Sequence, residues 1–167
     1  TSIPPHGIVL SGTGTEAVAF VAEVARAGAI VKVTHRIAGS AVAPRAVVGG
    51  WPRVVQSGRN VGGIADSLEG TFPRFGENRH PRSALAIARD STTLLMVVVD
   101  GRRPWSVGMS LRELGDALLA LGAWDAMNLD GGGSSTLWIR GRVVNYPSDP
   151  TGERAVGNAL FVGTHQR

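Results

Sequence analysis

The residues with the clearest chemical potential lie in the run 128–135, which reads Asn-Leu-Asp-Gly-Gly-Gly-Ser-Ser. Its three glycines, Gly131, Gly132 and Gly133, have no Cβ, so the main chain there can adopt positive φ and approach a ligand closely. Consecutive N–H groups in such a bend form a concave site that suits anions. The run also carries one carboxylate and several groups that donate and accept hydrogen bonds, at Asn128, Asp130, Ser134 and Ser135. Asp and Gly are ordinary turn residues too, but three glycines exceed the need of a turn, and we predict a ligand-binding bend.

Further acids and basic groups lie in loops of the same part of the chain. The acids are Asp100, Asp149 and Glu153, and the basic residues are Arg79, His80, Arg82, Arg102 and Arg154. Glycoside hydrolysis commonly uses two carboxyl groups on either side of the scissile bond. A guanidinium group matches the geometry of phosphate. The combination predicts a site for a sugar that bears a phosphate, although the segment 79–82 also fits a solvated basic turn.

Other chemistries fit the sequence less well. The chain has no cysteine, which excludes a thiol nucleophile, a disulfide and a thiolate metal site. Ser134 does not lie in a Gly-x-Ser-x-Gly elbow, and the glycines match neither a phosphate-binding loop nor a dinucleotide-binding fingerprint. The oxygen ligands could hold Mg²⁺ or Ca²⁺, but the spacing of an EF-hand is missing. We therefore expect no cofactor, with a divalent cation as the minority alternative.

Length and charge narrow the class of protein. The 167 residues are 43% hydrophobic and 18% charged, as expected for one globular domain. The longest apolar run, 94–99, is far shorter than the roughly 20 residues that span a bilayer, so no membrane helix is expected. The net charge is +4, but the sequence contains no block of five or six basic residues, and aromatic residues make up only 5%. Nucleic acid is therefore not an expected partner.

Two helices are predicted from the spacing of apolar residues. The first begins at Thr15 and stops at Gly28. The second runs from Ser110 to Leu121, and Ser110 with Glu113 matches a capping box at its start. Glu113 is for this reason better explained as a cap than as a catalytic acid.

Strands are predicted where β-branched and apolar residues run together between turn residues. The predicted ranges are 8–10, 29–37, 45–48, 53–56, 83–89, 93–100, 124–129, 136–140, 142–145 and 158–162. The strand at 93–100 is apolar on both sides and is expected to be central and covered on both faces. The range 57–81 lacks periodicity and is expected to be a long loop, and His35 is expected to be a core residue. These elements predict an α+β fold, a mixed β-sheet with two main helices packed on it and the site in loops at strand ends.

Several motifs, in this order, resemble the phosphodiester glycosidase family. They are Val-Val-Val-Asp-Gly-Arg at 97–102, Gly-Met-Ser-Leu-Arg-Glu-Leu at 108–114, Asn-Leu-Asp-Gly-Gly-Gly-Ser-Ser-Thr at 128–136, and Val-Val-Asn-Tyr-Pro-Ser-Asp with Gly-Glu-Arg within 143–154. The resemblance is clear from about Arg79 to Val162. It implies hydrolysis of a sugar-1-phosphodiester bond, with release of the sugar, on a phosphorylated glycan or exopolysaccharide. The alternative is a non-catalytic binding module for anionic polysaccharide.

The resemblance also implies a set of site residues. It gathers Arg79, His80, Arg82, Asp100, Arg102, Asn128, Asp130, Gly131, Gly132, Gly133, Ser134, Ser148, Asp149, Glu153 and Arg154. Among them we expect Asp130 and Glu153 to be the catalytic acids, with Asp100 as a further candidate. Arg79 and Arg102 are expected to hold the phosphate, and the remaining residues to bind the substrate.

The start of the chain departs from the family pattern. The family domain usually begins earlier, with an Asn-Gly-x-Phe-type motif, and this chain has no Asn-Gly pair. We therefore expect residues 1–167 to form a single phosphodiester glycosidase-like domain that lacks the N-terminal part of the family domain. That part could be supplied by a separate chain. A secreted or cell-envelope location is expected, although no signal peptide is visible.

Overall fold

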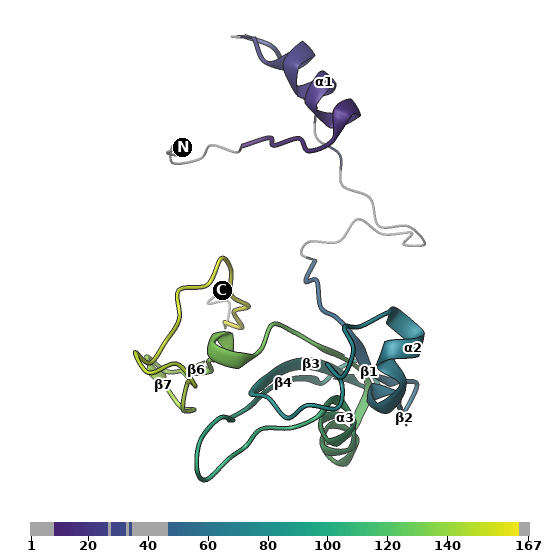
Figure 1. Cartoon of the computed structure of the whole chain (residues 1–167), viewed down its shortest axis with the longest axis vertical. Coiled ribbons are helices and arrows are strands. Elements are labelled where there is room, and N and C mark those ends of the chain that lie inside the picture. The colour runs from purple at the N-terminus through teal and green to yellow at the C-terminus, as the bar shows by residue number, and fades with distance from the viewer. Residues whose placement is uncertain (1–8, 27, 33, 35–46, 164–167) are drawn as a thin grey trace. The chain divides into compact units, whose positions relative to one another are not determined.

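The structure, a computed structural model, describes residues 9–26, 28–32, 34 and 47–163. The chain divides into two compact units, Thr1–Val47 and Val48–Arg167, and each is described by itself (Figure 1). The prediction of a single domain stays a prediction. No described helix is long and apolar enough to cross a membrane.

The first unit contains one described helix, α1 (Thr15–Val24), which confirms the predicted start. The helix ends four residues before Gly28. The described residues of the ranges 8–10, 29–37 and 45–48 are not in strands, so those predictions are wrong where they can be compared. The rest of these ranges, His35 included, lies outside the described residues.

The second unit is built on a five-stranded sheet in which every pairing is antiparallel. The order across the sheet is β2 (Arg59–Asn60), β1 (Arg53–Gln56), β5 (Ala123–Asn128), β3 (Arg82–Ala88) and β4 (Leu94–Val99). Two further strands, β6 (Trp138–Ile139) and β7 (Arg142–Val143), form the expected hairpin around Gly141. The α+β class is confirmed. The sheet was expected to be mixed, and its described pairings all run antiparallel.

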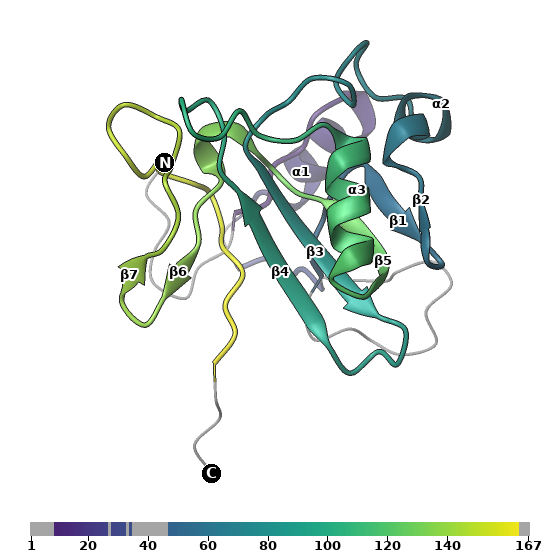
Figure 2. The ribbon, with the colours of Figure 1, turned by 90° about the horizontal axis from the view of Figure 1, so that it is seen from below.

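Helix α3 (Leu111–Ala120) lies across one face of the sheet (Figure 2). Its start is the predicted capping box, in which Ser110 accepts a hydrogen bond from the Glu113 amide and the Glu113 carboxylate accepts one from the Ser110 amide. The apolar side chains of the helix are fully buried against the sheet, at Leu111, Leu114 and Leu118. Burying each leucine stabilises the fold by about 1.5–3 kcal/mol.

Three predictions about the second unit are wrong. Strand β4 lies at the edge of the sheet rather than in its centre, and Leu94 is 51% exposed. The range 57–81 is not a continuous loop, because it contains β2, η1 (Gly62–Ile64) and α2 (Ala65–Glu69). The range 158–162 forms no strand. The apolar sequence of β4 therefore did not mean that the strand is central. One covered face of the strand was enough to select apolar residues.

Candidate functional site

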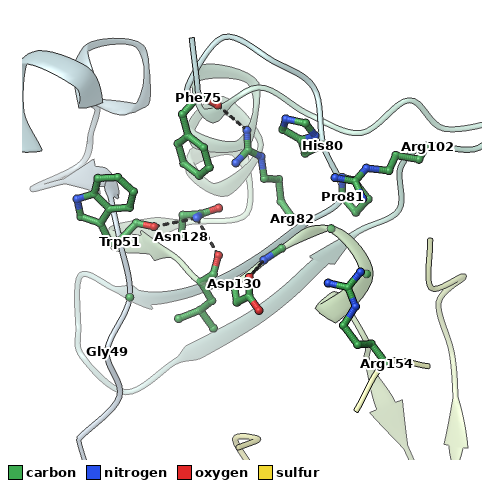
Figure 3. Close-up of a pocket in the computed structure, with 15 residues that line it drawn as sticks. Gly49, Trp51, Phe75, His80, Pro81, Arg82, Arg102, Asn128, Asp130 and Arg154 are labelled. Carbon is green, nitrogen blue, oxygen red and sulfur yellow. Dashed lines mark hydrogen bonds between the residues drawn. The ribbon is translucent and has the colours of Figure 1, made fainter. Parts of the chain in front are cut away.

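A pocket of about 650 Å³ opens where β5 ends and β3 begins. The short helix η2 (Gly132–Ser134) and the segment just before β1 complete its wall (Figure 3). The pocket is lined by Gly49, Gly50, Trp51, Phe75, His80, Pro81, Arg82, Arg102, Asn128, Leu129, Asp130, Gly131, Gly132, Gly133 and Arg154. The structure thus brings nine of the predicted site residues to one pocket: His80, Arg82, Arg102, Asn128, Asp130, the three glycines and Arg154.

One side of the pocket is aromatic. The rings of Trp51 and Phe75 stack with their centroids 5.7 Å apart and an interplanar angle of 25°. The Trp51 indole N–H donates to the Glu69 carbonyl over 3.2 Å, which fixes the ring from behind. Trp51 remains 37% exposed. We call Trp51 and Phe75 the aromatic wall.

Asn128 joins this aromatic wall to the glycine bend. It is only 2% exposed, and its side-chain Nδ2 donates to the carbonyls of Trp51 (2.9 Å) and Leu129 (2.8 Å). The two main chains are also paired, because the Trp51 amide donates to the Asn128 carbonyl and the Asn128 amide to the Pro52 carbonyl. Both amide hydrogens of Asn128 are therefore used inside the protein. Its role in the site is to hold the segment before β1 against the end of β5.

The other side of the pocket is cationic, and its most buried member is Arg82, which is 2% exposed. The guanidinium group donates to three main-chain carbonyls, those of Met109 (3.0 Å), Phe75 (3.1 Å) and Asn78 (2.9 Å). Within the described part of the chain no carboxylate forms a salt bridge with it. Burial lowers the pKa of Arg82 to about 10, because desolvation penalises the charged form. The group is still charged at neutral pH.

His80 and Arg102 extend the cationic side (Figure 3). The pKa of His80 is lowered from its ordinary value, first by burial and then by the positive charges of Arg82 and Arg102. Neutral imidazole is therefore favoured at pH 7, and it can donate a hydrogen bond without adding charge. We call His80, Arg82, Arg102 and Arg154 the cationic wall.

The three glycines are needed by contacts within the protein itself. A Cβ on Gly131 would lie 2.8 Å from the Pro81 carbonyl oxygen, and one on Gly133 would lie 2.2 Å from the Asp149 carboxylate. Gly132 has a φ of +63°, with the Arg102 guanidinium next to it. Any larger residue would therefore displace part of the pocket wall.

The amides of this bend do not form the free concave site that the sequence suggested. The Gly131 amide donates to the Asp130 carboxylate (2.9 Å) and the Gly132 amide to the Pro81 carbonyl (3.0 Å). The amides of Ser134 and Ser135 donate to the carbonyls of Gly131 and Gly132, both over 3.2 Å. Because these four donors are occupied, positive charge in the pocket comes mainly from guanidinium groups.

Asp130 is the acid that lines the pocket in the described structure, and its side chain lies between the two walls (Figure 3). Arg154 reaches the same pocket from the loop after β7, where it forms a bidentate pair with Asp149 at 2.8 and 2.9 Å. Asp149 therefore lies behind the pocket lining, and its carboxylate holds the Arg154 side chain in place.

The remaining predicted residues lie off the pocket lining. Arg79 is paired with Glu113, at the start of α3. Asp100 accepts hydrogen bonds from the Asn145 side chain (3.0 Å) and the Tyr146 amide (2.9 Å). The others in this group are Glu153, whose carboxylate accepts from the Trp138 indole, and the two serines Ser134 and Ser148. Asp100 therefore has a clear positioning role, since it ties the loop after β7 to the end of β4.

A family model described as phosphodiester glycosidase matches residues 2–163. The chain belongs to the phosphodiester glycosidase family. This confirms the resemblance seen in the motifs between Arg79 and Val162.

Curated relatives of the chain are much longer than the chain itself. The SPβ prophage-derived uncharacterized protein YomE of Bacillus subtilis is 38% identical over 84 residues, which are 50% of this chain and 13% of that protein. N-acetylglucosamine-1-phosphodiester α-N-acetylglucosaminidase of Bos taurus is 38% identical over 80 residues, 48% of this chain and 15% of the relative. The chain thus spans less than a sixth of the length of these curated relatives.

A solved structure is similar in fold to part of this chain. It is the catalytic domain of zebrafish N-acetylglucosamine-1-phosphodiester α-N-acetylglucosaminidase, auto-inhibited by its pro-peptide. The TM-score is 0.54 at 27% identity, and the match covers 61% of this chain and 35% of that one.

The aromatic wall was not predicted from the sequence. Trp51 follows Gly49 and Gly50 in the chain. A Cβ on Gly50 would lie 2.8 Å from the Asn128 carbonyl oxygen, so this glycine lets the segment run against the end of β5. A double glycine directly before a tryptophan was the available signal.

Among the described residues no group of three or more His, Cys, Asp or Glu could hold a metal ion.

Proposed function

We propose that this pocket hydrolyses the bond between a sugar and a phosphodiester, with the sugar against the aromatic wall and the phosphate against the cationic wall. The observation that carries the proposal is Arg82, a buried guanidinium group in the pocket wall that is bonded to carbonyls and to no described carboxylate. Burying a charge is costly unless an opposite charge is supplied. A bound phosphate would supply it.

The aromatic wall supports the sugar half of the proposal. A pyranose ring has a face of C–H groups, and indole and phenyl rings present flat apolar surfaces that suit such a face. Trp51 is held from behind by Glu69 and is partly exposed towards the pocket. Family membership and the likeness to the zebrafish catalytic domain support the same class of substrate.

In the proposed reaction the bond between the anomeric carbon and the phosphate oxygen breaks, and its electron pair leaves with the phosphate. The second pKa of a phosphate monoester is about 6, so the departing oxygen needs little protonation when cations stabilise its charge. We assign this role to Arg82, Arg102 and Arg154, which line the pocket. Asp130 accepts the proton of the water that adds to the anomeric carbon.

Glu153 remains the proposed second carboxylate, since it belongs to the loop that carries Arg154. Its carboxylate accepts a hydrogen bond from the Trp138 indole over 3.2 Å. Glu153→Gln would keep that acceptor oxygen and remove the charge. A loss of turnover comparable to that of the Asp130 variant would assign Glu153 to the reaction, and unchanged turnover would remove it.

The test is release of free sugar from UDP-N-acetylglucosamine or a comparable sugar-1-phosphodiester. Asp130→Asn removes the proton acceptor, and we expect turnover to fall at least 10²-fold. The matched control is Asp90→Asn, because Asp90 lies in the turn at the opposite end of β3 and, among the described residues, its side chain accepts hydrogen bonds from Thr92 of the same turn. Turnover that survives Asp130→Asn would remove this residue from the catalytic role.

A second candidate function is a module that binds anionic polysaccharide without cleaving it. It is favoured by one observation, that Asp100 and Glu153 are engaged in other contacts of the described structure. Calorimetry with a phosphorylated glycan beside the turnover assay separates the two functions, since binding without product supports the module. In either function we propose a secreted or cell-envelope setting, where a phosphorylated glycan would be met.

A further inference from the structure

Asn60, Asn128 and Asn145 each donate both side-chain amide hydrogens to acceptors within the protein. In Asn60 and Asn145 the side-chain oxygen is used as well. The first accepts from the Gly62 amide over 2.9 Å, and the second from the Leu137 amide over 2.8 Å. The Asn128 oxygen is buried and has no hydrogen-bond partner among the described residues. Buried acceptors are nearly always paired, so this exception needs an explanation.

The orientation of the Asn128 amide group is fixed by its neighbours. Its nitrogen lies 2.9 Å from the Trp51 carbonyl oxygen and 2.8 Å from the Leu129 carbonyl oxygen. A carbonyl only accepts, so an exchange of the amide nitrogen and oxygen would place three oxygens against one another. The oxygen therefore points away from both carbonyls, and Figure 3 shows it on the side of the amide group that faces Arg82. Asn128 thus brings an unpaired acceptor to the pocket lining.

The missing partner has to be a hydrogen-bond donor, which decides between the two halves of the proposed substrate. A phosphodiester carries no proton at neutral pH and only accepts hydrogen bonds. A sugar offers hydroxyl groups, and an N-acetylated sugar offers an amide N–H as well. Because Asn128 is bonded to the main chain of Trp51 and its oxygen faces Arg82, the acceptor lies where the two walls meet. A sugar against the aromatic wall would present one of its donors there.

We propose that the side-chain oxygen of Asn128 determines specificity by accepting a hydrogen bond from one donor group of the sugar. The inference rests on the proposed function, since it uses a sugar that lies against the aromatic wall. Asn128 then has two roles, because its nitrogen joins two segments of the chain and its oxygen reads the ligand. A sugar without that donor leaves the buried acceptor unpaired, and a site of this kind discriminates strongly against such a sugar.

The experiment uses a ligand that cannot be hydrolysed, so that binding is measured whether or not the protein cleaves its substrate. The parent ligand is the methyl ester of the phosphonate in which a CH₂ group replaces the bridging oxygen of N-acetylglucosamine-1-phosphate. Its analogues each lack one sugar donor. They are the 3-deoxy, 4-deoxy and 6-deoxy sugars and a sugar with an O-acetyl group in place of the N-acetyl group. We expect calorimetry to show a loss of affinity of about tenfold or more for a single analogue, and of less than about threefold for each of the others.

Asn128→Leu tests whether Asn128 causes this selectivity. The variant has no acceptor, so the difference in affinity between the parent and the sensitive analogue should disappear, even if both bind more weakly because the two segments are no longer joined. Asn60→Leu is the matched control, because Asn60 has the same pattern of donated hydrogen bonds and does not line the pocket. The selectivity should stay in this control.

A measurement on the unaltered protein serves if Asn128→Leu does not fold. The ¹³Cγ resonance of Asn128 should shift when the parent ligand binds and stay in place when the sensitive analogue binds, because only the parent donates to the oxygen. The ¹³Cγ resonance of Asn60 should stay in place with both ligands. An Asn128 shift that is the same for the two ligands would overturn the proposal.

The outcomes separate this inference from the proposed function. Equal affinity for the parent and all its analogues, no binding of the parent, or a selectivity that survives Asn128→Leu would overturn the role of the Asn128 oxygen, whatever the turnover. The expected selectivity in a protein that releases no sugar from UDP-N-acetylglucosamine would count against the proposed hydrolysis and still support this inference.

Discussion

The two walls of the pocket are built from opposite physical chemistry. The aromatic wall, Trp51 and Phe75, is apolar and is fixed by ring stacking and one hydrogen bond from the indole. The cationic wall gathers three guanidinium groups and an imidazole around the bend at 131–133. Under the proposed function, affinity for the sugar and affinity for the phosphate would arise from different side chains of the pocket. The two walls meet where Arg82 donates to the Phe75 carbonyl and lies 4.9 Å from the centroid of the Phe75 ring. Trp51 on one wall and Arg102 on the other can still be altered singly, and the two variants should respond differently to salt.

The largest effect is expected from Arg82→Met. This change leaves three carbonyls without their donor and removes the buried charge. We expect unfolding in urea to show a loss of about 2–4 kcal/mol, and calorimetry to show no binding of a sugar phosphate. Arg82→Lys restores a charge without the planar fork. If a stable Arg82→Lys protein binds as tightly as the unaltered one, the fork is not what recognises phosphate.

Trp51→Ala tests the aromatic wall. We expect affinity for a sugar phosphate to fall about tenfold, because one stacking surface is lost, while the affinity for inorganic phosphate changes much less. Titrations at 50 and 300 mM salt should show the same slope for this variant and for the unaltered protein. A changed slope would mean that the ring also organises the cationic wall.

Arg102→Gln is expected to have a smaller effect, because Arg102 is exposed. The dissociation constant of a sugar phosphate should rise about threefold to fivefold at low salt, and the difference should shrink as salt is added. Calorimetry over a salt series measures both. A loss that is independent of salt would indicate that the side chain acts by packing beside Gly132.

The smallest effect is expected from changes to the ion pair of Glu113 and Arg79. These changes also test whether Arg79 belongs to the cationic wall. The hydrogen bond from Arg79, followed by that from the Ser110 amide, lowers the pKa of Glu113 from 4.5 to about 2. The folded protein therefore favours the ionised acid, so this contribution to stability is complete above about pH 4.5 and is lost as the pH falls towards 2.

Glu113→Gln should remove that part of the acid dependence, with a cost below about 1 kcal/mol at pH 7 because the pair is solvent-exposed. Urea unfolding at pH 7, 4 and 3 measures it. Arg79→Gln should show the same loss of stability, with sugar-phosphate affinity that stays within about twofold. A weakening of binding as large as that of Arg102→Gln would place Arg79 in the cationic wall.

The sequence predicted the elements whose signals are local. The capping box located the start of α3, and β1 matches its predicted range of residues 53–56. The acid, the glycines and all four basic residues of the pocket lining were also among the predicted site residues, since charged side chains near a glycine run point to a ligand. Strand β4 was placed wrongly because an apolar run does not reveal how many neighbours a strand has.

Other features of the pocket depend on contacts between distant segments. Arg79 and Arg82 are equivalent by residue type, and only the fold decides that one pairs with Glu113 while the other is buried in the pocket wall. Trp51 and Phe75 meet because Asn128 holds the segment before β1 against the end of β5. No local pattern records that pairing, and the aromatic side of the pocket could not be derived from spacing.

The three carbonyl bonds of Arg82 have a consequence for the speed of recognition. The guanidinium group is buried and oriented by the fold, so under the proposed function an arriving anion would not have to strip water from it or wait for a rotamer. The protein carries that cost as lower intrinsic stability in the empty state. Saturation with a tight anionic ligand should for this reason raise the melting temperature more than the contacts of the ligand alone would account for.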